Sequence, residues 1–263
     1  MNQQGSRFGS GIEAFLYAGI LVLSMWLVFW AQHLFRYDFY QLGVLPQTLS
    51  GLKGILFMPL IHDKFEIEHI LNNTFATFFL TAALFYFYRE IALKVLFFGW
   101  IFTGFFLWIY ALNNGAYHVG MSGVIYVLAG FLFTSGAIRH YMPLQAISLF
   151  VVFIYGSMIW GIFPMKAHVS WEGHFVGLIV GIALAYIYKS KGPQRPKYQY
   201  EIEQEMGLEP IDLEAIWIEN QRVIQEQFEA NENPMNENVA PKQIVYHFMP
   251  NQTKVAPEDK TDQ

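Results

Sequence analysis

A serine between two nearby glycines begins one of the apolar stretches of this 263-residue chain. It is Ser122, in the sequence Gly120-Met121-Ser122-Gly123. At the N-terminus of a helix, such a serine lies beside unpaired backbone N–H groups and the positive end of the helix dipole, which favour a developing oxyanion. Gly120 permits a tight turn, and Gly123 lets another helix come close. A serine at a helix start is also a common N-cap, so the motif has a structural alternative.

A histidine, His174, lies in a second apolar stretch beside glycines that recur at every fourth position: Gly173, Gly177 and Gly181. Small residues at this spacing let two membrane helices pack closely, so the histidine could reach a serine on the neighbouring helix. A neutral imidazole is well suited to accept a hydroxyl proton near pH 7. The structural alternative is a histidine that is hydrogen-bonded to a backbone carbonyl.

Two further polar residues, His69 and Asn73, begin another apolar stretch and lie four residues apart. This spacing puts them on one face of a helix, one turn apart. Both side chains can donate hydrogen bonds to an oxyanion. They form a poor pair of metal ligands, and no HExxH motif occurs in the chain. As an alternative, both could satisfy the start of the helix.

An aromatic residue, Tyr126, follows Ser122 by four residues and therefore lies one turn along the same helix face. Its ring could stack on an imidazole and hold the orientation of that imidazole. Packing in an aromatic core is the alternative role.

The composition of the chain is that of a membrane protein. Hydrophobic residues make up 54% of it, and charged residues make up only 14%, which is well below the roughly 25% of soluble domains. The chain has no cysteine, which excludes a disulfide framework, a cysteine nucleophile and a thiolate metal site. No metal or organic cofactor is expected, and no nucleic-acid partner.

Six apolar stretches could cross a bilayer, because about 30 Å of hydrocarbon needs roughly 20 helical residues. The fourth and sixth are short and rich in Gly and Ala, which suits helices inside a bundle. The expected fold is therefore all-α, a polytopic membrane protein with a bundle of six transmembrane helices. The predicted spans are Ala14–Phe35, Glu68–Tyr88, Ile91–Leu112, Ser122–Ile138, Pro143–Phe163 and Gly173–Tyr188.

Basic residues near the ends of these spans predict that both termini are cytoplasmic. They precede the first span, lie between the second and third and between the fourth and fifth, and follow the sixth. Three basic residues in the loop 36–67 run against this bias. That loop is long for a compact bundle, and loops of this length are commonly functional. Residues 49–61 are apolar but too short to span, which favours a re-entrant or interfacial helix.

The two ends of the chain differ in charge. Residues 1–191 carry 10 Lys/Arg and 7 Asp/Glu, whereas residues 192–263 carry 6 and 14. We predict that 1–191 form the membrane domain and that 192–263 form an acidic cytoplasmic tail, partly helical or disordered. Within this tail, residues 201–229 are typical of short amphipathic helices, and the composition from Ala230 onward favours disorder.

In combination, these motifs closely resemble the rhomboid family of intramembrane serine proteases. Members have six or seven spans, with HxxxN in the second, GxSG at the start of the fourth, and a histidine followed by GxxxG in the sixth. The matching residues, in the same order, are His69 and Asn73, then Gly120, Ser122 and Gly123, then His174, Gly177 and Gly181. Tyr126 matches as well, and the resemblance covers roughly residues 12–190. In the first loop, Gln47 stands where related sequences often carry Arg.

The resemblance implies peptide-bond hydrolysis by Ser122 as nucleophile, with His174 as general base and then general acid. It also implies an oxyanion hole formed by the N–H of Ser122 and the side chains of His69 and Asn73. The expected substrates are single-span membrane proteins, and the expected location is a bacterial inner membrane. The oligomeric state stays open.

Two other classes of function deserve comparison. A catalytically inactive relative would bind or route client membrane proteins, but such relatives tend to lose the serine or the histidine, and both are present here. A small transporter would also carry polar residues in its spans. It would place them near mid-membrane in paired broken helices, whereas these residues gather toward one side and no inverted repeat is visible.

Overall fold

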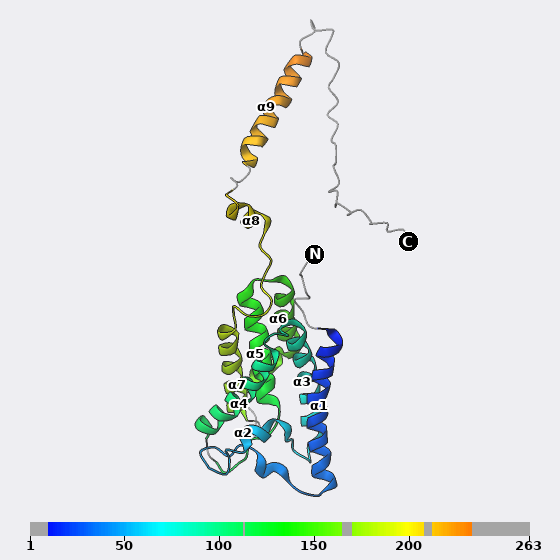
Figure 1. The fold of residues 1–263 in the computed structure, drawn as a ribbon, viewed down its shortest axis with the longest axis vertical. Helices are drawn as coiled ribbons and strands as arrows, with labels where there is room; N and C mark the ends of the chain where they lie inside the picture. Colours follow the sequence, from blue (N-terminus) through cyan, green and yellow to red (C-terminus); the bar gives the residue numbers. More distant parts are fainter. Residues whose placement is uncertain (1–9, 113, 165–169, 208–211, 233–263) are drawn as a thin grey trace, which may run out of the picture. The chain divides into compact units, whose positions relative to one another are not determined.

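The computed structural model describes residues 10–112, 114–164, 170–207 and 212–232, and it is helical throughout (Figure 1). Within these ranges the only β-type pairing is an isolated bridge between Val44 and His118. The chain divides into two compact units, residues 1–197 and 198–263. The first unit contains six apolar helices: α1 (Gly11–Leu34), α3 (Ile67–Phe87), α4 (Ala92–Tyr110), α5 (Ser122–Arg139), α6 (Met142–Tyr155) and α7 (Trp171–Ile187).

These six helices coincide with the six predicted spans, so the prediction of an all-α membrane bundle is confirmed. Among the described residues, α1, α3, α4 and α5 are long and apolar enough to cross a bilayer, whereas α6 and α7 are shorter apolar helices. The largest difference is in the fifth span, expected over Pro143–Phe163. Its α-helix ends at Tyr155 and continues as the 3₁₀ segment η3 (Gly156–Ile162), because this segment turns inward to contact α7.

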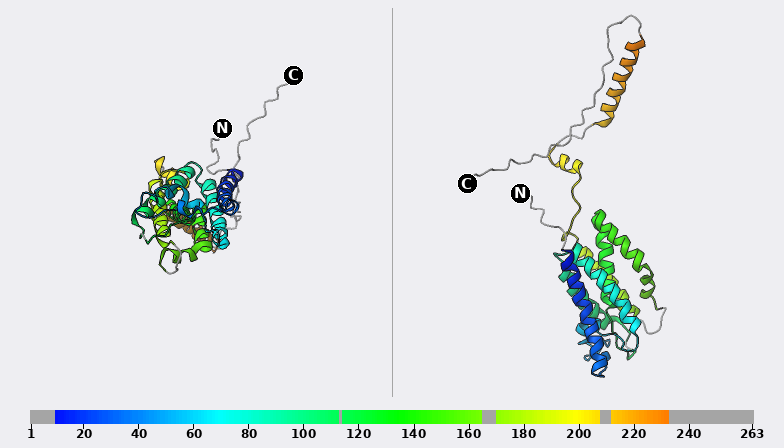
Figure 2. Two further views of the ribbon diagram at one scale, coloured as in Figure 1. Left: turned by 90° about the horizontal axis from the view of Figure 1, so that it is seen from below. Right: turned by 90° about the vertical axis from the view of Figure 1, so that its right-hand side faces the viewer.

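Helix α5 is the centre of the bundle. It packs most extensively on α7 and also contacts α6, α4 and α3. Its side chains are buried on nearly every face, which explains its small residues. Helix α1 lies at the periphery against α3 (Figure 2). It exposes a broad apolar surface, as expected for a helix that faces lipid; the residues are Leu16, Ile20, Leu23, Leu27 and Trp30.

The glycines of α7 allow the close approach to α5. A Cβ atom on Gly177 would overlap the carbonyl oxygen of Gly123, and one on Gly181 would overlap that of Val127. At the far end of the helices, the buried Arg139 donates hydrogen bonds to the carbonyls of Tyr188 and Lys191, both at 2.8 Å. An arginine there satisfies carbonyls at the end of α7 and closes the α5–α7 pair at this end.

The first loop forms a short irregular layer against α4, where Trp108 and Trp100 donate hydrogen bonds to the carbonyls of Thr48 and Leu56. Residues 49–61, for which a re-entrant or interfacial helix is expected, contain helical turns only at α2 (Gly54–Phe57) and η2 (Met58–Leu60). A preceding turn, η1, covers Phe39–Leu42. Gln47 anchors the loop on α4, because its amide donates to the carbonyls of Ile109 and Ala111 at 3.2 and 3.4 Å.

The second unit contains α8 (Gln199–Glu205) and α9 (Leu213–Glu232). Both helices fall in or beside the stretch 201–229, where the sequence indicates amphipathic helices. In α9, the apolar residues Ile216, Trp217, Ile224 and Phe228 are exposed. The predicted disorder from Ala230 onward lies almost entirely outside the described residues and stays a prediction.

The contact at Gly181 generates a first prediction. A Gly181→Ala variant should lose roughly 1–3 kcal/mol of stability, because the new methyl group meets backbone atoms of α5 that cannot move aside. Thermal unfolding of the purified protein in detergent measures this. The control is Gly19→Ala in α1, where nothing lies within 4 Å of the added atom and alanine favours the helix. Equal melting temperatures of the two variants would contradict the close α5–α7 contact.

Candidate functional site

Ser122 is the first residue of α5, and the first loop contacts the preceding residues His118 and Gly120. The chain enters this helix through Gly120, whose φ of 111° lies in a region that residues with a side chain rarely adopt. The turn places Met121 in the core, fully buried, and leaves the Ser122 hydroxyl facing α7. The local role of Gly120 is therefore conformational.

The hydroxyl of Ser122 contacts the imidazole of His174. The distance from Ser122 Oγ to His174 Nε2 is 2.8 Å, and the His174 side chain is 9% exposed. The two residues are 52 positions apart and meet because Gly177 brings the backbones of α5 and α7 together. Such a contact lets the imidazole accept the serine proton.

The orientation of the His174 ring is set from its other side. Its Nδ1 lies 2.9 Å from the carbonyl oxygen of Gly161 in η3. A carbonyl accepts only, so Nδ1 carries the proton and Nε2 presents its lone pair to Ser122. The ring of Tyr126 stacks on the imidazole, with centroids 4.4 Å apart and planes inclined by 15°. His174 thus contacts both a serine on the neighbouring helix and a backbone carbonyl, which were the two alternatives considered for it.

His69 and Asn73 approach the turn before Ser122 from α3. A Cβ atom on Gly120 would lie 3.0 Å from His69 Nε2 and 3.7 Å from Asn73 Nδ2. Asn73 is 6% exposed, and its Nδ2 has no hydrogen-bond partner among the described residues. The neighbouring Asn72 is exposed. A buried amide donor without a partner, next to the turn that leads into Ser122, can bind an oxygen that becomes negatively charged.

The other glycines differ in their contacts. A Cβ on Gly123 would lie 2.9 Å from the Thr103 methyl group and 3.4 Å from the Gly173 carbonyl oxygen. Gly173 faces the side chains of Ser170 and Leu107 at 3.1 Å or more. Gly173 is therefore less tightly packed than Gly177 and Gly181. Among the described residues, no group of three or more His, Cys, Asp or Glu side chains is arranged to hold a metal ion.

A second serine–histidine contact joins two residues that each precede a residue of the first pair by four positions, and the sequence analysis did not identify it. His118 Nδ1 lies 2.6 Å from Ser170 Oγ, and Ser170 also caps α7 by accepting a hydrogen bond from the N–H of Gly173. Burial lowers the pKa of His118, so this ring is neutral near pH 7. The sequence does carry a signal for this contact, because His118 precedes Ser122 by four residues and Ser170 precedes His174 by four residues.

Comparison with known proteins finds one family model and several relatives that are similar to this chain. The family model described as the Rhomboid domain matches residues 49–191. Uncharacterized proteins of Mycobacterium tuberculosis and Mycobacterium bovis are 31% identical over 166 residues, which cover 58% of this chain and 65% of each relative. An uncharacterized protein of Mycobacterium leprae is 28% identical over 190 residues, covering 67% of this chain and 73% of the relative. The chain thus spans less than two thirds of the first two relatives.

The position of Gly161 generates a second prediction. In a Gly161→Ala variant the new methyl group would overlap the hydroxyl of Tyr126 and lie 3.0 Å from His174 Nδ1. The imidazole should shift, and the rate at which a fluorophosphonate labels Ser122 should fall by about 10-fold or more.

Tyr126→Phe provides the matched control for this prediction. It removes the overlapping hydroxyl and keeps the stacked ring, so alone it should leave labelling within a few-fold of wild type. Added to Gly161→Ala, it should restore part of the rate. Unchanged labelling in Gly161→Ala would show that η3 does not orient the imidazole.

Proposed function

The chain belongs to the rhomboid family, whose members are generally intramembrane serine proteases, and we propose that it is an intramembrane serine endopeptidase. The observation that carries the proposal is the 2.8 Å contact between Ser122 Oγ and His174 Nε2, with the opposite ring nitrogen held by a carbonyl. The chain is a multi-pass membrane protein. The proposed reaction therefore takes place inside the membrane domain, where α5 begins and contacts α7.

In the proposed mechanism, Ser122 Oγ attacks the scissile carbonyl carbon and its proton passes to His174 Nε2. The substrate oxygen becomes an oxyanion, which accepts hydrogen bonds from the Ser122 N–H, His69 Nε2 and Asn73 Nδ2. The protonated His174 then donates its proton to the leaving amine, and the C–N bond breaks. A water molecule, activated by the same imidazole, hydrolyses the acyl-enzyme and regenerates Ser122.

No third carboxylate is required in this mechanism. The Gly161 carbonyl holds the His174 tautomer that leaves Nε2 free, and the stacked Tyr126 ring restricts rotation of the imidazole. In a Ser-His-Asp triad, an aspartate performs the orienting role. A backbone carbonyl performs it here without placing a charge among apolar helices, where a charge is costly.

The proposed substrates are single-span membrane proteins whose helix unwinds near the membrane surface. The proposed orientation puts both ends of the chain in the cytoplasm of a bacterial cell, because Arg89, Lys94 and Lys189 lie near the ends of helices opposite the first loop. The N-terminal end of α1 also lies opposite α2 in Figure 1. Ser122 would then open to the extracytoplasmic side, from which water reaches it.

The first test of the proposal removes the nucleophile or the base. Ser122→Ala and His174→Ala should each reduce cleavage of a transmembrane substrate to background, because the two groups act as one unit. Cleavage is measured with purified protein in detergent or liposomes. Ser50→Ala, which changes an exposed serine of the first loop, should cleave at the wild-type rate. An inactive client-binding relative would show no Ser122-dependent cleavage in the wild type.

The second test separates an oxyanion hole from helix capping. His69→Ala and Asn73→Ala should each lower kcat by about 10² to 10³, as loss of one oxyanion donor does, while a lost cap would cost about 1 kcal/mol of stability and little rate. Asn72→Ala is the matched control, because Asn72 is exposed and lies about 100° around the helix from Asn73. If Asn72→Ala and Asn73→Ala were equally damaging, the assigned face of α3 would be wrong.

A further inference from the structure

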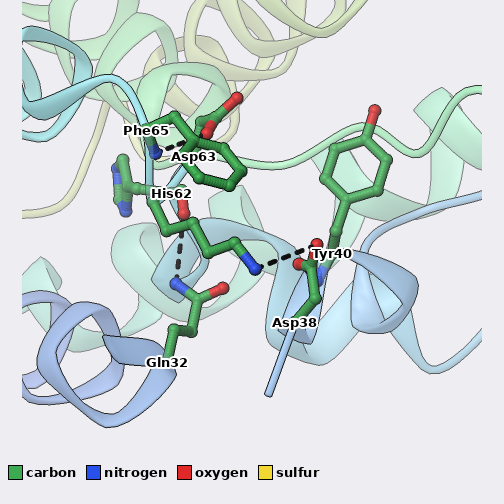
Figure 3. A network of polar contacts seen from close by, with 7 residues as sticks. Gln32, Asp38, Tyr40, His62, Asp63 and Phe65 are labelled. Atoms are coloured by element: carbon green, nitrogen blue, oxygen red, sulfur yellow. Dashed lines mark hydrogen bonds and ion pairs between the residues drawn. The ribbon is translucent and has the colours of Figure 1, made fainter. Parts of the chain in front are cut away.

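A further histidine, His62, lies beside the site and has no part in the mechanism above. It follows η2 in the first loop and is 1% exposed. Figure 3 shows its ring next to the short polar network that ends the loop. A buried imidazole outside a reaction mechanism needs a structural or positioning reason.

The ring of His62 contacts the backbone that leads into Ser122. The N–H of Met121 donates a hydrogen bond to His62 Nε2 at 3.4 Å, and the preceding N–H, that of Gly120, donates to the carbonyl of Met58 at 2.9 Å. The first loop thus engages two successive N–H groups. The next N–H, that of Ser122, has no partner among the described residues and is left available for an oxyanion.

The same ring also contacts a side-chain donor of the proposed oxyanion hole. The His62 and His69 rings meet edge to face, with centroids 5.2 Å apart and planes inclined by 67°. One residue therefore touches both the peptide beside the nucleophile and a proposed donor from α3. Burial, together with the neighbouring His69, lowers the pKa of His62 to about 3, so its Nε2 can accept a hydrogen bond at neutral pH.

The position of His62 is itself fixed by α1. The amide of Gln32 donates to the His62 carbonyl oxygen at 3.1 Å, and Gln32 is only 2% exposed (Figure 3). In the residues that follow His62, Lys64 forms an ion pair with Asp38 at 3.6 Å, and the Asp63 carboxylate accepts a hydrogen bond from the N–H of Phe65. A buried glutamine is costly in a membrane helix, so this contact accounts for its presence.

We propose that His62 is a positioning residue, held by Gln32 of α1, which fixes the Gly120–Ser122 turn and His69 in the geometry that binds the oxyanion. This inference rests on the proposed protease function. It assigns to the peripheral helix α1, which lies away from Ser122, a role in the chemistry. A histidine that only filled space in the core would not need the hydrogen bond from the Met121 N–H.

The test uses the full-length protein and a transmembrane substrate, with kcat, KM and melting temperature measured together. His62→Phe keeps an aromatic ring against His69 but removes the acceptor for the Met121 N–H. We expect kcat to fall by about 10- to 100-fold and KM to change less than about 3-fold, because the variant loses transition-state contacts. His62→Gln, which retains an acceptor, should recover part of kcat.

Two controls separate positioning from stability. Leu84→Ala empties a fully buried position in α3 that lies about four turns from His69, so it should lower the melting temperature while leaving kcat unchanged. In combination with His69→Ala, His62→Phe should reduce kcat by less than the product of the two single losses, since both act on the same oxyanion. The inference would be overturned if, at equal melting temperatures, kcat fell no more in His62→Phe than in Leu84→Ala.

If His62→Phe does not fold, Gln32→Leu provides the same test from α1, and an unchanged kcat in the folded variant would overturn the inference. Failure of the proposed function has a different signature. In that case wild type itself shows no cleavage that depends on Ser122, and the inference falls with it. If wild type cleaves and Ser122→Ala does not, the results for His62 and Gln32 decide the inference alone.

Discussion

At Gly177 and Gly181, the backbone of α7 lies directly against carbonyl groups of α5. Between membrane helices there is little hydrophobic driving force, so shape complementarity and close backbone contact must hold such a pair together. The distance between Ser122 and His174 depends on this contact, because each side chain is too short to reach across a wider gap. Just before these helices begin, His118 and Ser170 form a second contact between the segments that lead into α5 and α7.

Around this pair of regular helices, the chain uses irregular backbone where the site needs it. The turn at Gly120, the 3₁₀ segment η3 and the first loop all leave peptide groups without regular helical partners. Such segments are tolerated at membrane depth only where protein or water satisfies their polar groups. Here the first loop satisfies the N–H of Gly120, and His174 satisfies the carbonyl of Gly161. The polar groups of these irregular segments are therefore paired either with another such segment or with a side chain of the site.

The sequence predicted the helical bundle and the side chains that meet at its end, because spans and small-residue spacing are local signals. It did not indicate Gly161, His62 or the His118–Ser170 contact. Their roles depend on the paths of loops, and a backbone carbonyl leaves no trace in residue identity. For residues 49–61 the sequence indicated a re-entrant or interfacial helix, but not its extent: only α2 and η2 are helical there, and α2 packs on α4. Gln47, at a position where related sequences often carry Arg, anchors the loop through its side-chain amide.

The carbonyl of Gly161 has one more consequence, which concerns how the site responds to acidity. A carboxylate that orients an imidazole has an ionisation of its own, so the two groups titrate as a coupled pair. A peptide carbonyl has no ionisation in the range that proteins experience. The tautomer of His174 is consequently selected by a permanent dipole, and acidification acts on the imidazole itself while its orienting partner stays constant. Because Nδ1 carries a proton in both the neutral and the charged imidazole, its hydrogen bond to the Gly161 carbonyl is compatible with either form.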